Sequence, residues 1–291
     1  VRDLSFTRDE IKFFLNDGLL IFTKPVAGEH VGAIFAGGEE SADGELLLLP
    51  PNRDERTSLA KFTRTPNLDE HFSAALFAFT DSTARDIQTE IAAGRGRLVT
   101  EECNPVAAQW DPVVANLNGS LAQRIAGDLL APTRPGGGFL FASLQSMRLG
   151  GFDIMYDPLS DDQIVVGKLN ERAGYWAYDV WTGFPARSIR TGAVAPYEPP
   201  FRITSYKISA SLDDSLALKA TTRATIHVGD KPGRALTFGI SRAERVTAAR
   251  LDGAPVELLY QESERSRALR ANENDLFLRS EEHTSELQSL A

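Results

Sequence analysis

Histidine, cysteine and carboxylate side chains build most catalytic and metal sites, and their spacing in this chain is unpromising. The helical zinc motif of many metalloproteases places two histidines four residues apart on one face of a helix. His30, His71 and His227 lie far apart, and none has a second histidine at that spacing. The single cysteine, Cys103, follows two glutamates, whose charges disfavour the reactive thiolate. We therefore expect no catalytic, cofactor-binding or metal-binding residue in this sequence.

Three other segments resemble binding motifs only in part. The glycine run 136–138 lacks the Gly-Lys-Ser/Thr ending of a phosphate loop and precedes a strand pattern, which favours a flexible linker. The acidic segment 157–162 lacks the alternating spacing of a calcium loop and indicates a polar turn. The aromatic run 175–181 suggests a sugar-stacking platform, but alternation divides its rings between both faces of a strand. A buried strand accounts for it better.

Composition limits the classes of protein to consider. With 42% hydrophobic and 24% charged residues, the 291-residue chain falls in the globular range and is long enough for two domains. Its formal charge of −9 argues against a nucleic-acid partner, which requires a basic surface. No apolar run reaches the roughly 18 residues of a membrane span. One cysteine excludes an intramolecular disulfide and leaves the cellular compartment open.

The elements of the first half are expected to be strands interrupted by helices. Apolar runs at 11–15 and 19–23 flank Asn16-Asp17-Gly18, which predicts a hairpin, and 31–35 and 45–49 predict further strands. Asn52 with Glu55 predicts the start of one helix, and Asp81 predicts the start of a second. A longer helical pattern covers about 105–130. Strand patterns then return, at 139–144, 152–156, 163–169 and 175–181.

The second half has the clearest alternation of the chain. Residues 203–212 and 216–228 predict two long strands joined by a turn at 213–215. Shorter strands are expected at 235–240, 246–251 and 256–260, with a hairpin turn at Asp252-Gly253. The proline-rich segment 195–200 suits a connection between domains. We therefore predict a mainly β fold: an α+β domain over 1–192, followed by a partial β-sandwich over 193–278.

The strand pair beginning at Tyr206 resembles a known domain. The run 206–226, with its acidic turn at 213–215, and the later segments 236–238 and 246–253 resemble the opening strands of a β-sandwich "saddle" domain. That saddle precedes the catalytic domain in the M1 family of zinc aminopeptidases. The preceding residues are similar to the long leader of some bacterial members. The resemblance implies that this chain is a non-catalytic N-terminal region of such an enzyme.

The family's catalytic motifs do not occur in this chain. Neither His-Glu-x-x-His nor the Gly-x-Met-Glu-Asn exopeptidase loop is found, so no catalytic residue carries over. The resemblance implies that the zinc ion and the peptide substrate belong to a catalytic domain further along the parent chain, which would be this region's partner. The alternative is a β-sandwich binding or scaffold module without enzymatic activity.

The end of the sequence has a different character. Residues 279–289 read R-S-E-E-H-T-S-E-L-Q-S, which matches the translation of a common short-read sequencing adapter. We expect 279–291 to be a non-native tail, which removes His283 from any site, and we expect the natural gene to continue beyond Leu278. A sandwich without its remaining strands would expose an edge and a core face, so we also expect the last third to aggregate.

Overall fold

Strands dominate the chain, which confirms the mainly β prediction. The computed structural model describes residues 1–38, 42–99, 121–122, 124–131, 134–172, 175–199, 201–229, 235–241, 245–259 and 273–279. Ten strands form one antiparallel sheet: β1 Arg2–Arg8, β2 Ile11–Asp17, β3 Leu19–Phe22, β4 Gly32–Ala36, β5 Gly44–Leu48, β6 Leu68–Phe79, β7 Leu140–Ser146, β8 Gly150–Tyr156, β9 Ile164–Arg172 and β10 Tyr175–Phe184.

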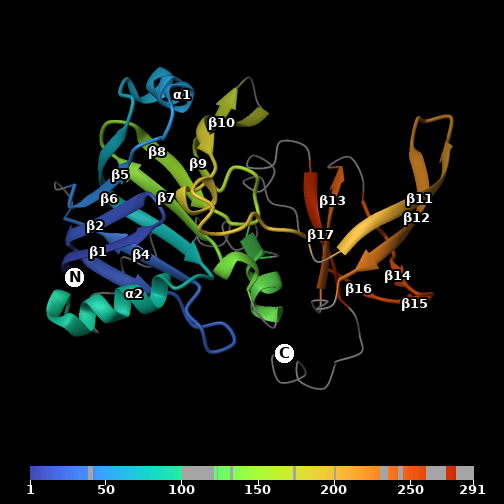
Figure 1. Cartoon of the computed structure of the whole chain (residues 1–291), viewed down its shortest axis with the longest axis horizontal. Coiled ribbons are helices and arrows are strands. Elements are labelled where there is room, and N and C mark those ends of the chain that lie inside the picture. Colours follow the sequence, from blue (N-terminus) through green and yellow to red (C-terminus); the bar gives the residue numbers. More distant parts are fainter. Residues whose placement is uncertain are drawn as a thin grey trace.

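The long strand β6 organises this sheet. Its first half pairs with β5 and its second half with β4 along the same edge, while β7 pairs along the other edge. The main strand order is β1-β2-β5-β6-β7-β8-β9-β10, and β3 pairs only with β4. Figure 1 shows the sheet as one strongly twisted layer at the left of the molecule.

The core lies on one face of this sheet and is rich in phenylalanine. Alternation brings Leu4 and Phe6 of β1 and Ile11, Phe13 and Leu15 of β2 to the buried face. Helix α1 (Arg53–Thr63) places Phe62 against Trp181 of β10, and α2 (Thr83–Glu90) packs beside β1. Helix α1 begins directly after Asn52, as predicted, whereas the N-cap of α2 is Ser82 instead of the predicted Asp81. The Asp81 carboxylate still accepts a hydrogen bond from the Thr83 amide.

The opposite face of the sheet is covered over part of its area. Residues 121–130 are helical where they are described, and Leu121 and Ile125 pack there against Ile34 and Leu76. This confirms the end of the long predicted helix. Its earlier part, from about 105 to 120, lies outside the described residues, as does Cys103.

The hairpin predicted at residues 16–18 is wrong. β2 and β3 do not pair with each other; β2 pairs with β1 and β5, whereas β3 continues onward to pair with β4. Glycine is required at position 18 because the backbone of Ala36 lies close by, and not because the chain reverses there. A Cβ on Gly18 would lie 2.6 Å from the Ala36 carbonyl oxygen. The true reversal is the two-residue turn at Asp9 and Glu10, between β1 and β2.

The glycine run 136–138 is a packed turn rather than a free linker. Residues Pro135–Gly137 form a short 3-10 turn leading into β7. All three glycines have positive φ, and Gly138 is buried against the backbone of Thr80. The turn therefore belongs to the sheet and marks no boundary between domains.

The second half contains the predicted long hairpin, β11 (Phe201–Leu212) with β12 (Leu218–Val228). β13 (Ala235–Ser241), β17 (Glu273–Arg279) and β16 (Glu257–Leu259) form a three-stranded sheet in that order, and β14 (Arg250–Leu251) pairs with β15 (Ala254–Pro255). The strand predicted at 246–251 is wrong for residues 246–249, which do not pair with another strand. Small alanines at 248 and 249 make that alternation a weak strand signal.

Candidate functional site

The hairpin β11–β12 has two chemically different faces. Residues directly opposite on antiparallel strands share a face, and the register pairs Tyr206 with Ala224, Ile208 with Thr222, Ala210 with Ala220 and Leu212 with Leu218. These eight residues form what we name the apolar hairpin face. The intervening positions form the polar hairpin face: Lys207, Ser209, Ser211, Lys219, Thr221 and Arg223.

The apolar hairpin face is exposed. Tyr206 is 60% exposed, Ile208 64%, Leu212 61% and Leu218 58%. In Figure 1 the hairpin projects away from the ten-stranded sheet. Several large apolar side chains exposed to water on one face are characteristic of a surface that another protein element covers.

The turn of this hairpin is held by one carboxylate. Oδ1 of Asp213 accepts hydrogen bonds from the amides of Ser215 and Ala217, both at 2.9 Å, and from the Ser215 hydroxyl at 2.6 Å. The Ser215 hydroxyl and these amides stabilise the ionised form and lower the pKa of Asp213. Leu216 then takes a left-handed conformation with φ of 64°.

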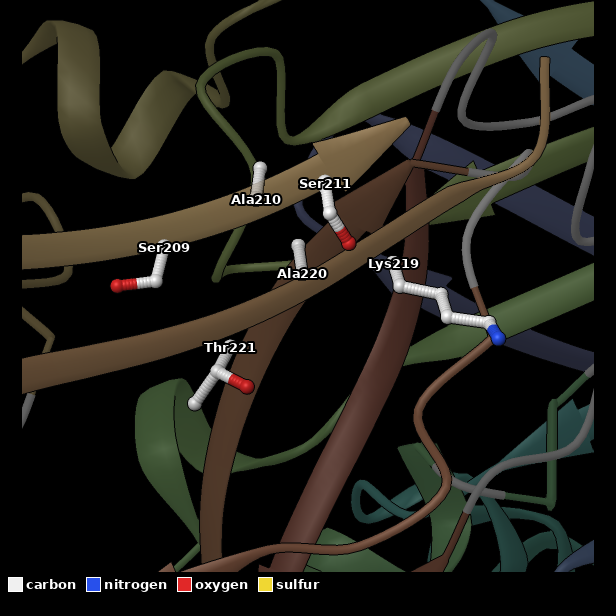
Figure 2. A pocket seen from close by; sticks show the side chains of 6 residues that line it. All are labelled: Ser209, Ala210, Ser211, Lys219, Ala220 and Thr221. Carbon is white, nitrogen blue, oxygen red and sulfur yellow. The ribbon is translucent and has the colours of Figure 1, made fainter. Parts of the chain in front are cut away.

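A shallow hollow of about 270 Å³ lies across the two strands of the hairpin. Figure 2 shows its lining, which consists of three facing pairs: Ser209 with Thr221, Ala210 with Ala220 and Ser211 with Lys219. All six residues are exposed, so the hollow has no desolvated polar group with which to hold a small ligand.

The histidines considered in the sequence occupy different environments. Nδ1 of His30 lies 2.9 Å from the Thr23 carbonyl oxygen, and the ring packs on Phe22. His227 is exposed on β12, whereas His71 is exposed on β6 beside two carboxylates. The structure therefore brings no two of these histidines together. His283 lies outside the described residues.

The carboxylates beside His71 are Glu45 and Asp69. Glu45 stands directly opposite His71 in the β5–β6 register, and Asp69 precedes His71 by two residues on the same face of β6. One ligand atom from each of the three side chains lies within 4.8 Å of the other two. Sequence reasoning missed this group because Glu45 and His71 meet only through the strand register. The Asp-x-His spacing in a strand was the available signal.

A buried ionic network fastens the helical residues 121–130 to the sheet. The Arg124 guanidinium contacts the carboxylates of Asp128 and Asp157, and the Thr80 hydroxyl donates to Asp128. Burial raises the pKa of Asp128, although Arg124 acts in the opposite direction. The predicted turn at 157–162 thus begins with a buried carboxylate that has a structural partner.

Tyr197 of the proline-rich segment is half-buried. Burial raises the pKa of Tyr197, and the charges of Arg124, Asp128 and Asp157 also act on it.

The aromatic run of β10 is only partly as predicted. Trp181 is buried and stacks between Phe62 and Phe152, as a core residue would. A register shift between Val180 and Thr182 interrupts the simple alternation, so that Trp181 and Thr182 are both buried. The side chains of residues 175–177 lie outside the described part.

No helix within the described residues is both long and apolar enough to cross a membrane. Comparisons of the chain with known protein families, characterised proteins and solved structures find no match. The function proposed below therefore rests on the chain's own residues.

Proposed function

We propose that this chain is the non-catalytic N-terminal region of an M1-like zinc metallopeptidase. Its partner is then the remainder of the saddle and the catalytic domain of the same parent chain, which docks on the apolar hairpin face. The parent would cleave N-terminal peptide bonds with a zinc-activated water and a glutamate base, both supplied by that catalytic domain. The net charge of −9 supports a protein or peptide partner over a nucleic acid.

The observation that carries the proposal is the apolar hairpin face. It coincides with the segment, starting at Tyr206, on which the saddle resemblance rests. Each large aliphatic side chain that becomes fully buried contributes about 1.5–3 kcal/mol. Ile208, Leu212 and Leu218 together therefore supply a substantial part of the free energy with which a covering sheet would dock.

The decisive experiment is long-read sequencing of the parent gene across the codons that follow Leu278. We expect an in-frame continuation that encodes His-Glu-x-x-His on a helix. A natural stop soon after that codon, or a continuation without the motif, would overturn the peptidase proposal. The chain would then be assigned to the alternative, a β-sandwich binding or scaffold module.

A protein-level test follows from the same gene. The complete parent chain should release the N-terminal residue from an aminoacyl chromogenic substrate, and a chelator should abolish this activity. Ile208→Lys should lower the yield of folded parent, whereas Ser209→Lys on the polar hairpin face should not. Equal yields from the two variants would contradict docking on the apolar hairpin face.

A further inference from the structure

Glu45, Asp69 and His71 form a mixed nitrogen and oxygen cluster on the sheet face opposite the main core. Helical residues 121–130 cover another part of that face, over β4 and the second half of β6. Asp69 and His71 remain exposed, and Glu45 is half-buried. All three side chains project from paired strands, so the backbone ladder fixes their spacing.

The separations suit a divalent first-row metal ion. Zinc binds imidazole nitrogen and carboxylate oxygen at about 2.0–2.2 Å, which places tetrahedral ligands about 3.4 Å apart. The ligand atoms here lie within 4.8 Å of one another, so small rotations of exposed side chains would close the set. Two carboxylates with one imidazole favour zinc over calcium or magnesium, which prefer all-oxygen sites.

A contact outside the cluster supports the ligand role of His71. Its Nδ1 lies 3.3 Å from the carbonyl oxygen of Ala42. A carbonyl only accepts hydrogen bonds, so Nδ1 is the donor in that contact, which leaves Nε2 as the nitrogen available to a metal ion. A backbone carbonyl that orients the second ring nitrogen is the usual support of a metal-bound histidine.

Lys12 of β2 is a cation on the same face of the sheet. Lys12 shares a row with Asp69 but is separated from it by Leu47 of β5. Two inter-strand spacings place the Lys12 and Asp69 backbones roughly 10 Å apart. The two carboxylates thus leave the site with negative charge for a dication.

We propose that Glu45, Asp69 and His71 bind one zinc ion, which links β5 to β6 and leaves a fourth position for water. This inference is independent of the peptidase proposal, because that enzyme's zinc belongs to a different domain. Three ligands on an exposed surface predict micromolar rather than tighter affinity.

The test is calorimetric titration of zinc into the present chain, prepared without a polyhistidine tag. We expect one site per chain, and at least about tenfold weaker binding in each of His71→Ala, Asp69→Asn and Glu45→Gln. The matched control is His227→Ala, which removes another exposed strand histidine and should leave the affinity unchanged. These are surface substitutions, and circular dichroism would establish that each variant is folded.

A second readout separates a true site from diffuse binding. Zinc should shift the Nε2 resonance of His71 in nitrogen-15 NMR spectra and leave that of His227 in place. The inference is overturned by absence of zinc binding at about 1 mM, by affinity that persists in the three variants, or by a preference for calcium. None of these outcomes would bear on the sequence downstream of Leu278.

Discussion

At the scale of single residues, the buried charges of this chain fasten elements that are far apart in sequence. Arg124 joins Asp128 of its own helical segment to Asp157 beyond β8. Glu70 of β6 is buried and contacts Ser146, the last residue of β7, and Arg148, which follows that strand. Such groups are costly to bury, so each has a partner in place.

Asp128 should make the stability of the chain depend on acid pH. Its pKa in the folded chain lies above the ordinary value of 3.8, because burial outweighs the attraction of Arg124. Preferential protonation of Asp128 in the folded chain raises the free energy of unfolding. This contribution is complete below pH 3.8 and is lost as the pH rises through the folded-state pKa. From pH 6 to pH 4, urea unfolding should therefore show wild type gaining stability relative to Asp128→Asn. A relative loss over that range would mean that the pKa is lowered instead.

At the scale of elements, two turns depend on backbone conformations that side chains disfavour. Gly138 enters β7 with φ of 97°, and Leu216 closes the β11–β12 turn with φ of 64°. In the first turn glycine relieves the strain, whereas in the second a leucine retains it.

Gly138→Ala should destabilise the sheet by about 2–4 kcal/mol in denaturant unfolding. The added Cβ would lie 2.6 Å from the backbone carbon and oxygen of Thr80, which cannot move without disturbing the Thr80–Phe139 hydrogen bond. Gly137→Ala is the matched control. Its φ is also positive, but no atom lies within 4 Å of its Cβ position, so it should cost only about 1 kcal/mol. Equal costs would show that the contact with Thr80 is unimportant.

Leu216→Gly should slow local opening of the hairpin, whereas Leu216→Ala should not. Glycine removes the Cβ that disfavours positive φ, and this difference amounts to about 1 kcal/mol, or roughly fivefold in an opening equilibrium. The measurement is amide hydrogen exchange at Leu212 and Leu218, which face each other beside the turn. Similar exchange rates in the two variants would argue against strain at this position.

At the scale of the whole molecule, the chain combines a well-packed sheet with a hairpin that has an uncovered apolar face. In the isolated chain, that face should drive self-association, as expected from the sequence for its last third. Ile208→Lys should shift the sedimentation profile toward monomer, and Ser209→Lys should leave it unchanged. A wild-type chain that is already monomeric at every concentration would contradict this expectation.

Sequence patterns predicted the elements better than their partners. Alternation located β11 and β12, and the capping residues located α1 and α2, because these signals are local. The prediction of a hairpin at Gly18 failed because the neighbour that requires glycine there is Ala36, which is distant in the sequence. The Glu45–His71 pair was missed for the same reason: cross-strand register is a tertiary property. The boundary at residue 192 and the partial sandwich over 193–278 stay predictions.

The strand order also has a consequence for how the chain folds. β7, β8, β9 and β10 pair in the order of the sequence through short connections, the longest of seven residues. β6 and β7, by contrast, are separated by 60 residues, and closing that loop costs about 2 kcal/mol more than closing one of seven. We therefore expect the β7–β10 meander to assemble early. Pairing of β7 with β6 would then be the slow step in folding. Until it occurs, the unpaired edge of β7 is open to pairing with another chain.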